Sequence, residues 1–379
     1  MMEMRVATGV RRPDRVTVAR GLLALAVALV VLKGVLPDWV IRLPEGMLLP
    51  FADWINAGFA FLRDEFGLMA FTRAFAEVVE FLLDMTANLL YGKSRWPGLG
   101  PIPWVVIAGT MGMIGYALGG WRLALLSGGT FVWIAMMGQW KWAMETLSVI
   151  IVAAPLSILL GLLMGAAAWR WRWVERVMNP LLNIAQSMPH FAYMIPVVVF
   201  IGVGPKAGAI VTIIFSVPPM IRMTMLGLRA VSPEIIESGK MCGATRWQLM
   251  TRVRLPAART ELLIGVNQVI MQSLAMVVLA SFIGMPGLGQ KLLQLLQSLK
   301  IGLSVEIGVT IVLLAVVLDR VSKAWAHRQP VHHDAGVSFV ARHKILLIWC
   351  GVVLAGAALA QVLSLIHISE PTRLRRISY

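Results

Sequence analysis

The sequence is poor in charge and in cysteine. Asp, Glu, Lys and Arg make up 14% of its 379 residues, whereas a typical soluble domain carries about 25%. The two cysteines, Cys242 and Cys350, lie far apart, and each falls in or beside an apolar or helical segment. This spacing fits neither a disulfide framework nor a metal site, so we interpret both as packing residues.

Several enzyme signatures are also absent. The sequence has no G-x-x-x-x-G-K-[ST] loop, and Gly284–Lys291 has glycines and a lysine without that spacing. We therefore expect no ATPase site in this chain. It contains no Ser/His/Asp set, no zinc helix motif and no carboxylate pair at membrane depth, which argues against a membrane enzyme. A histidine-rich segment lacks the spacing of a helical ligand pair, and we expect no metal there (His327, His332, His333 and Asp334).

Apolar sequence is abundant instead. Hydrophobic residues make up 58% of the chain, and the mean hydropathy is +0.78. Because a spanning helix needs about 20 residues, nine windows are candidate membrane spans: Gly21–Leu36, Ile102–Leu118, Leu123–Met137, Leu147–Ala168, Phe191–Val203, Gly208–Met220, Leu263–Ile283, Leu303–Leu318 and Ile345–Leu363. The third, fifth and sixth are short, and a buried soluble helix is the alternative for each.

Positive charge indicates the orientation of these spans. The chain has a net charge of +15, and its basic residues lie between apolar windows rather than in one solvated domain. This distribution is typical of cytoplasmic loops and disfavours nucleic-acid binding. From a cytoplasmic start, alternation places inside the basic residues of 5–20, 170–176, 222–259 and 320–344, and it places 37–100 outside. Tryptophans mark the interfaces, where indole rings prefer to lie (Trp140, Trp142, Trp169, Trp171 and Trp173).

The chain divides into five expected regions. They are an N-terminal span with an extracytoplasmic amphipathic region (1–100), two additional spans (101–141), a main transmembrane domain that contains the loop 231–256 (142–326), a cytoplasmic linker with a further span (327–363) and a tail (364–379). Leu48–Leu90 carries regular charge in a helical pattern, which predicts extramembrane or interfacial amphipathic helices. The tail looks like translated adapter sequence. We expect the natural chain to continue past Gln361, in one version with a second half of the same kind fused in tandem.

The loop from Val231 to Pro256 carries several helix signals. Ser232 is a good N-cap, and Pro233 suits the first helical position. Gly243 can adopt the left-handed conformation that ends such a helix. Thr245 with Gln248 predicts a capping box that starts a second helix, and Pro256 disfavours helix at Leu255. The loop therefore reads as helix, glycine turn, helix and proline stop, a compact shape that favours more than a simple connection.

Three spaced elements of this loop resemble the "EAA" signature of bacterial ABC importer permeases. That signature reads Glu-Ala-Ala, three residues, Gly, nine residues, then Ile-x-Leu-Pro. The chain has Glu237-Ser238-Gly239, then Gly243, then Val253-Arg254-Leu255-Pro256. The spacing agrees throughout, with Ser238 and Gly239 replacing alanines and Val253 replacing isoleucine. Residues from about Trp142 to Trp325 further resemble permeases of glycine betaine/proline and choline importers, through Pro180–Pro196, Ile210–Thr224 and Gly265–Gly284.

The resemblance implies an all-α polytopic transmembrane bundle of the ABC importer permease type in the bacterial inner membrane. It implies a separate cytoplasmic ATPase that binds ATP, an extracytoplasmic substrate-binding protein, and a second permease half as a homodimer or tandem fusion. No cofactor is implied for this chain. The ATPase-coupling residues would be those of the loop (Glu237, Ser238, Gly239, Gly243, Ala244, Leu255 and Pro256), with Glu237 the main coupling residue. The cargo implied is a compatible solute, glycine betaine, proline or choline.

The seventh window carries Asn267, Gln268, Gln272 and Ser273. Polar side chains at membrane depth face a bundle interior or a wet path, so these residues either line the translocation pathway or form interhelical hydrogen bonds. Phe191 and Tyr193 are candidates for an aromatic contact with a quaternary ammonium cargo. The alternatives to this function are an ABC permease for another solute and a secondary transporter, although no span centre holds a charge.

Overall fold

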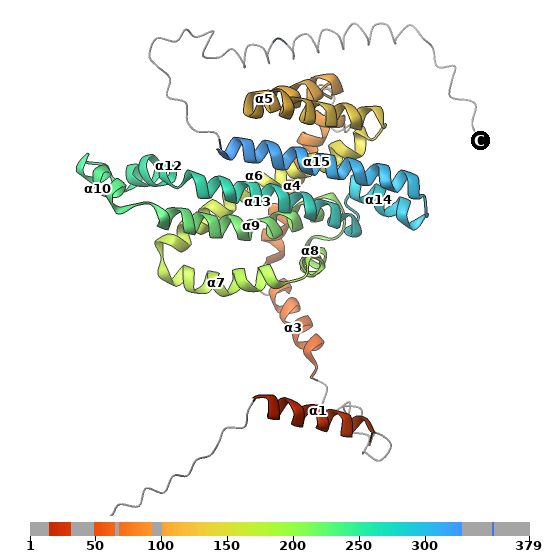
Figure 1. The fold of residues 1–379 in the computed structure, drawn as a ribbon, viewed down its shortest axis with the longest axis vertical. Helices are drawn as coiled ribbons and strands as arrows, with labels where there is room; N and C mark the ends of the chain where they lie inside the picture. The colour runs from red at the N-terminus through yellow and green to blue at the C-terminus, as the bar shows by residue number, and fades with distance from the viewer. Residues whose placement is uncertain (1–14, 32–48, 65–67, 93–100, 328–350, 352–379) are drawn as a thin grey trace, which may run out of the picture. The chain divides into compact units, whose positions relative to one another are not determined.

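The computed structural model describes residues 15–31, 49–64, 68–92, 101–327 and 351 (Figure 1). These residues fall into two compact units, 1–67 and 68–379. In the first unit, α1 covers Arg15–Val31 and α3 covers Phe51–Asp64. Most of the α1 leucines and valines are exposed, including Leu23 at 69% and Val31 at 76%.

The second unit is a helical bundle, and the described part of the chain contains no strand. Its elements are α4 (Leu68–Tyr91), α5 (Trp104–Met136), α6 (Trp140–Arg170), α7 (Arg172–Ser187), η3 (His190–Tyr193), α8 (Met194–Ile201), α9 (Pro205–Ala230), α10 (Pro233–Met241), α11 (Arg246–Gln248), η4 (Leu249–Arg254), α12 (Leu255–Ala257), α13 (Arg259–Leu279), η5 (Ala280–Ile283), α14 (Leu288–Gln297) and α15 (Ile301–His327). The predicted all-α fold is confirmed.

The core of the bundle is the packing of α6, α9 and α13, which lie side by side in Figure 1. Glycines allow these helices to approach closely: a Cβ atom at Gly161 would lie 2.4 Å from Met220 Cβ, and one at Gly265 would lie 2.8 Å from Met223 Cβ. Ser157 adds a bond from its hydroxyl to the Ile213 carbonyl at 3.3 Å. Small residues at such crossings are the means by which membrane helices associate.

Five described helices have the length and apolar composition of a membrane span. Four of them are α6, α9, α13 with η5, and α15, and the fifth, α5, has that length only over two arms joined at Gly119 and Gly120. The predicted windows 147–168, 208–220, 263–283 and 303–318 fall on four of them, while 102–118 and 123–137 both fall on α5. The window 191–203 corresponds to the shorter η3–α8 segment, and 21–36 overlaps α1. The ninth window lies outside the described residues except for Gly351, as does the tail 364–379.

Helix α5 is a hairpin rather than one straight helix. Gly119 and Gly120 have non-helical backbone angles, with φ +73° at Gly120. Beyond them the chain folds back, because a Cβ atom at Gly128 would lie 3.3 Å from Gly112 Cα and Ser127 donates to the Met111 carbonyl at 2.8 Å. Each arm has about 16 residues, or about 24 Å. The two separate windows predicted here are therefore the two arms.

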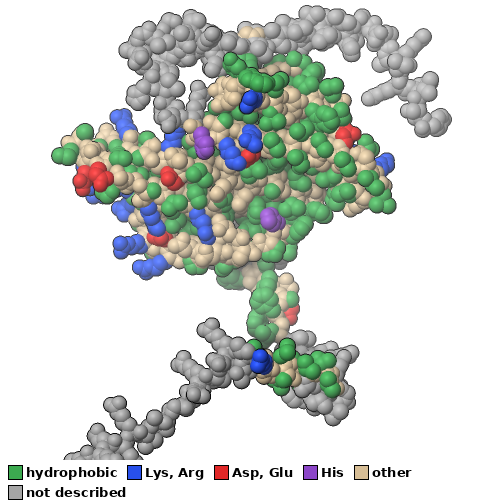
Figure 2. Space-filling model, viewed as in Figure 1, with side chains coloured by type: hydrophobic (Ala, Val, Ile, Leu, Met, Phe, Trp, Pro, Cys, Tyr) green, Lys and Arg blue, Asp and Glu red, His purple; other side chains and the backbone are tan. Residues whose placement is uncertain are grey.

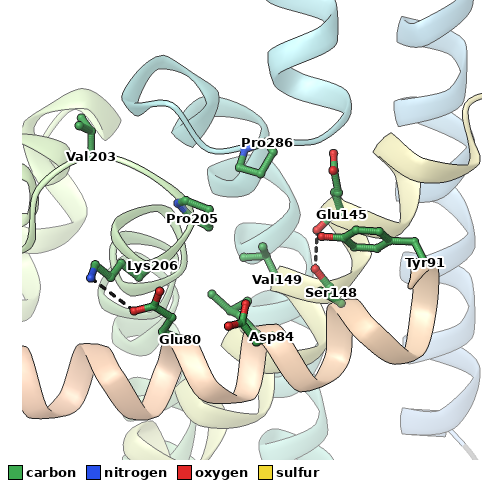
Figure 3. A pocket seen from close by; sticks show the side chains of 12 residues that line it. Glu80, Asp84, Tyr91, Glu145, Ser148, Val149, Val203, Pro205, Lys206 and Pro286 are labelled. Carbon is green, nitrogen blue, oxygen red and sulfur yellow. Dashed lines mark hydrogen bonds and ion pairs between the residues drawn. The ribbon is translucent and has the colours of Figure 1, made fainter. Parts of the chain in front are cut away.

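Helix α4 packs across the bundle on α6 and α9 (Figure 3). One face is buried, at positions three or four residues apart (Ala76, Val79, Leu83, Ala87 and Leu90). Glu80 reaches Lys206 at the start of α9, with 3.4 Å between carboxylate and ammonium. The predicted helical character of Leu48–Leu90 is confirmed in α3 and α4, and α4 is in addition an integral part of the bundle.

Candidate functional site

The coupling loop, defined here as Val231–Ala258, projects from one end of the long helices (Figure 1, α10 and α12). It joins α9 to α13 and contains α10, a glycine turn, α11, η4 and α12. η4 is a six-residue π-type turn. Figure 2 shows acidic and basic side chains gathered over this end of the bundle.

Helix α10 begins as the sequence predicts. Ser232 is the N-cap residue and Pro233 stands in the first turn. The Ser232 hydroxyl makes no cap bond to the helix backbone, however. The Glu234 carboxylate instead bonds its own backbone N–H and the Ser232 hydroxyl, and these bonds hold the pKa of Glu234 below its ordinary value.

The predicted glycine turn closes α10 through a Schellman motif. Gly243 has φ +73°, the left-handed region in which a Cβ atom is unfavourable. Its N–H bonds the Lys240 carbonyl at 2.9 Å, and the Ala244 N–H bonds the Gly239 carbonyl at 3.2 Å. A Cβ atom at Gly243 would meet nothing within 4 Å. The requirement for glycine there is thus conformational rather than steric.

The second helix opens with the predicted capping box. The Gln248 N–H donates to Thr245 Oγ1 at 3.3 Å, and the Thr245 N–H donates to Gln248 Oε1 at 2.9 Å. This reciprocal pair satisfies two backbone donors at the helix start.

The prediction that Pro256 ends this helix at Leu255 is wrong. Leu255 is helical, with φ −60° and ψ −45°, and the interruption comes at Ala258, with φ −81° and ψ 6°. Pro256 stands in the first turn of the short helix α12 that follows the π-type turn. Pro256 therefore lies where the π-type turn passes into α12, inside a continuous helical path.

The small residue Gly239 is where the two halves of the loop cross. A Cβ atom on Gly239 would lie 2.9 Å from Leu249 Cδ1 and 3.1 Å from Val253 Cγ2. The third residue of the Glu-Ser-Gly stretch and the first of the Val-Arg-Leu-Pro stretch are therefore packing partners. Thirteen residues separate them in sequence, so this contact explains why both elements belong to one signature.

A second contact fixes the loop to the bundle. Leu228, Val231 and Ala258 form a buried cluster, against which Trp169, Ile236, Met250 and Leu255, among others, pack. The Arg254 guanidinium lies 4.4 Å from the centroid of the Trp169 ring. Ring and cation attract one another in this arrangement. The loop is thus held against the ends of α6, α9 and α13.

The opposite face of α10 is exposed. Glu234, Glu237, Ser238 and Met241 are spaced three, one and three residues apart, so they share one helical face. All four are exposed, Met241 at 90%, and Trp247 on α11 is 75% exposed. Exposed methionine and tryptophan side chains are enriched where proteins bind one another, so Met241 and Trp247 suit this surface to a protein partner.

The four polar residues predicted on α13 separate into two pairs. The buried Ser273 hydroxyl lies 3.0 Å from the Ser216 hydroxyl on α9, and Asn267 accepts a hydrogen bond from Ser322 on α15. These two side chains join helices. Gln268 and Gln272 are half-exposed on another face of α13.

A break in the helix path between α7 and α8 was not predicted. Met188 and Pro189 are extended, with ψ 138° and 142°, and η3 follows them. The Tyr193 hydroxyl donates to the Ala185 carbonyl and ties the two sides of the break together. The dipeptide Met188-Pro189 was the available signal, because the residue before proline avoids helical angles.

A cavity of about 280 Å³ lies among α4, α6 and the first residues of α9 (Figure 3). Its lining includes Glu80, Asp84, Tyr91, Glu145 and Lys206. Figure 3 shows Lys206 directed at Glu80 across it, from α9 to α4. No group of side chains suited to a metal ion is found among the described residues.

Comparison with known proteins gives consistent matches. Residues 157–329 match the family model of the binding-protein-dependent transport system inner membrane component. The chain is 54% identical to the trimethylamine N-oxide transport system permease protein TmoV of Ruegeria pomeroyi, over 93% of this chain and 54% of that protein. It is 32% identical to the glycine betaine transport system permease protein OpuAB of Bacillus subtilis, over 76% of this chain and 95% of that protein.

A third relative is the glycine betaine/proline betaine transport system permease protein ProW of Escherichia coli, 33% identical over 73% of this chain and 75% of that protein. The chain spans about half the length of the TmoV proteins that it matches.

Proposed function

Because the chain belongs to the family of binding-protein-dependent transport system inner membrane components, which are multi-pass proteins of the inner membrane, we propose a role in import. In this proposal the chain is the translocation subunit of an ATP-driven importer for small methylated amines. The observation that carries the proposal is the coupling loop. Its signature residues form a closed, capped structure with one exposed face.

The proposed coupling works through two surfaces of this loop. The exposed face of α10, with Glu237 at its centre, contacts a cytoplasmic ATP-binding subunit. The buried contacts, Gly239 with Val253 and Leu255 with the cluster around Leu228, transmit the movement to the spans. Two further coupling residues stabilise α10. The Ser238 hydroxyl donates to the Glu234 carbonyl at 2.9 Å, and the Ala244 N–H donates to the Gly239 carbonyl at 3.2 Å in the Schellman motif.

The remaining partners follow from the same mechanism. An extracytoplasmic binding protein delivers the cargo, and a second permease half faces this one across a shared pathway. ATP binds to the partner subunit, and this chain uses no cofactor of its own.

The cargo is proposed from the relatives. Their names specify trimethylamine N-oxide for TmoV and glycine betaine for OpuAB, both of which carry three methyl groups on one nitrogen. We place trimethylamine N-oxide first and glycine betaine second, with choline and proline as alternatives, because identity is higher to the TmoV protein.

Reconstitution tests this proposal. The full chain is placed in liposomes with its ATP-binding subunit and binding protein, and uptake of labelled trimethylamine N-oxide, glycine betaine, choline and proline is compared with and without internal ATP. We expect uptake of the methylated amines that requires ATP and all components. Uptake that persists without the ATP-binding subunit would show a transporter driven by an ion gradient instead.

Glu237→Ala gives the narrower test of the coupling face, and Glu77→Ala, at an exposed glutamate of α4 away from this loop, is the matched control. We expect Glu237→Ala to insert into the membrane normally and to lose ATP-dependent uptake. Equal uptake in wild type and Glu237→Ala refutes the coupling role.

A further inference from the structure

The break between α7 and α8 lies at the middle depth of the bundle. The His190 ring packs against that of Phe215 on α9 at a tilt of 45°, with 4.7 Å between ring centroids, and the Tyr193 ring meets the same ring with 5.4 Å between centroids. Phe215 stands ten residues after the first residue of α9, which places it about 15 Å along a helix of about 39 Å. The irregular backbone therefore lies at a depth where lipid tails would surround an uncovered surface.

This irregular segment is exposed in the single chain. Ser187, Met188, Pro189, His190 and Phe191 are all exposed, Phe191 at 51%. Lipid cannot satisfy the polar groups of non-helical backbone, so such a segment persists at membrane depth only where protein or a water-filled cavity covers it. The face that carries the break is accordingly not a lipid face.

One face of α13 continues the same surface. Gln268, Gln272, Ala275 and Leu279 are spaced four, three and four residues apart and share this face, and Phe282 follows in η5, three residues after Leu279. All five are half-exposed or exposed, with Phe282 at 56%. Amide side chains facing lipid would be costly. The face ends at Phe282, whose ring meets that of Phe191 edge to face, with 5.3 Å between centroids.

We propose that the break at Ser187–Tyr193 and this face of α13 form one wall of the translocation pathway, and that the Phe191–Phe282 pair is a transient station for the methylated nitrogen of the cargo. The inference rests on the proposed function and names residues that would receive the cargo after its release from the binding protein. Aromatic rings attract quaternary ammonium groups through their electron-rich faces. The His190 ring, next to Phe191 in the chain, supplies a hydrogen-bond donor for the anionic end of the same molecule.

The first experiment asks whether this wall is in contact with water. In a full-length chain with Cys242→Ser and Cys350→Ser, single cysteines are introduced as His190→Cys and Gln272→Cys. A membrane-impermeant thiol reagent with a trimethylammonium group is then applied to the assembled transporter. The control is Leu159→Cys, at a 52% exposed position on α6 whose exposed neighbours along the helix, Ile151, Pro155 and Leu163, are apolar. We expect labelling at 190 and 272, and none at 159. If the cysteines at 190 and 272 are not labelled, or if all three positions are labelled equally, the assignment of the wall is overturned.

The second experiment asks whether the aromatic pair handles the cargo. Phe191→Leu and Phe282→Leu are compared with Phe191→Tyr, which keeps a ring, and with Phe81→Leu, whose ring on α4 is also 51% exposed. We expect about a three- to tenfold lower uptake rate in the first two variants, from the loss of a ring–cation contact. Uptake by the other two stays normal, and cargo affinity of the separate binding protein is unchanged.

The outcomes separate the two proposals. Wild-type protein that takes up no methylated amine overturns the proposed cargo and this inference together. Wild-type uptake combined with normal rates in Phe191→Leu and Phe282→Leu overturns the aromatic station alone and leaves the importer in place.

Discussion

Substitution of Gly239 tests whether the two halves of the coupling loop must touch. A Cβ atom there would approach Leu249 Cδ1 to 2.9 Å and Val253 Cγ2 to 3.1 Å. In Gly239→Ala the methyl group meets the far end of a leucine, which can rotate away. Alanine also favours helix over glycine by about 0.5–1 kcal/mol. We therefore expect Gly239→Ala to be close to neutral, and alanine is the residue that the family signature carries at this position.

A larger side chain cannot be accommodated in the same way. In Gly239→Leu the added atoms must enter the contact between α10 and η4, and overpacking of this kind costs about 1–3 kcal/mol. Since about 1.4 kcal/mol is a factor of ten, the packed loop conformation should lose roughly fivefold to more than a hundredfold in population. Docking of the ATP-binding subunit should fall in proportion.

The assay is co-purification of the ATP-binding subunit with each tagged variant, followed by the ATPase rate on addition of cargo-loaded binding protein. Gly308→Leu on α15 is the matched control, because a Cβ atom at Gly308 meets nothing within 4 Å. Gly239→Leu that retains the partner as well as Gly308→Leu does would refute the packing role of Gly239.

Three further predictions concern other contacts. Gly243→Ala should lose about 1–2 kcal/mol of loop stability, because φ +73° is unfavourable for alanine, whereas Gly243→Asn should lose less; partner retention in the two variants measures the difference. Ser216→Ala or Ser273→Ala should lower the melting temperature in detergent, and the double variant should be no worse than the worse single one, because the hydroxyls bond each other at 3.0 Å; additive losses would contradict this. Gly128→Leu should separate the arms of α5, since its Cβ atom would lie 3.3 Å from Gly112 Cα; faster proteolysis within 104–136 checks it, and unchanged cleavage would exclude close packing as the reason for glycine.

The coupling loop could be predicted from the sequence because its signals are local. The N-cap at Ser232, the turn at Gly243 and the capping box at Thr245 each depend on neighbours within a few residues. Pro256 shows the limit of such rules. Its effect on Leu255 was overridden by the π-type turn before it, which continues the helix to Ala258.

Contacts between distant segments were beyond prediction. Nothing in the sequence pairs Ser273 with Ser216 or Phe282 with Phe191, because these contacts depend on how α13 is rotated against its neighbours. Helix α7 was missed because its amphipathic sequence lacks the continuous apolar run of a span. The predicted domain division, the coupling roles of the loop residues and the pathway roles of α13 all stay predictions.

Helices α9 and α13, which the coupling loop connects, are joined by contacts at three positions along their length. The cluster around Leu228 joins the helices at one end, the Ser216–Ser273 contact joins them midway, and the Gly204 N–H bonds the Ile283 carbonyl at 3.0 Å at the other end. Helices held in this way cannot slide past one another. They would tilt as a rigid body. A tilt of roughly 10° applied at the loop would move the far end of a helix of about 39 Å by roughly 7 Å. Because all three contacts join α9 and its neighbouring residues to α13 and η5, such a tilt would carry the two helices together as one unit.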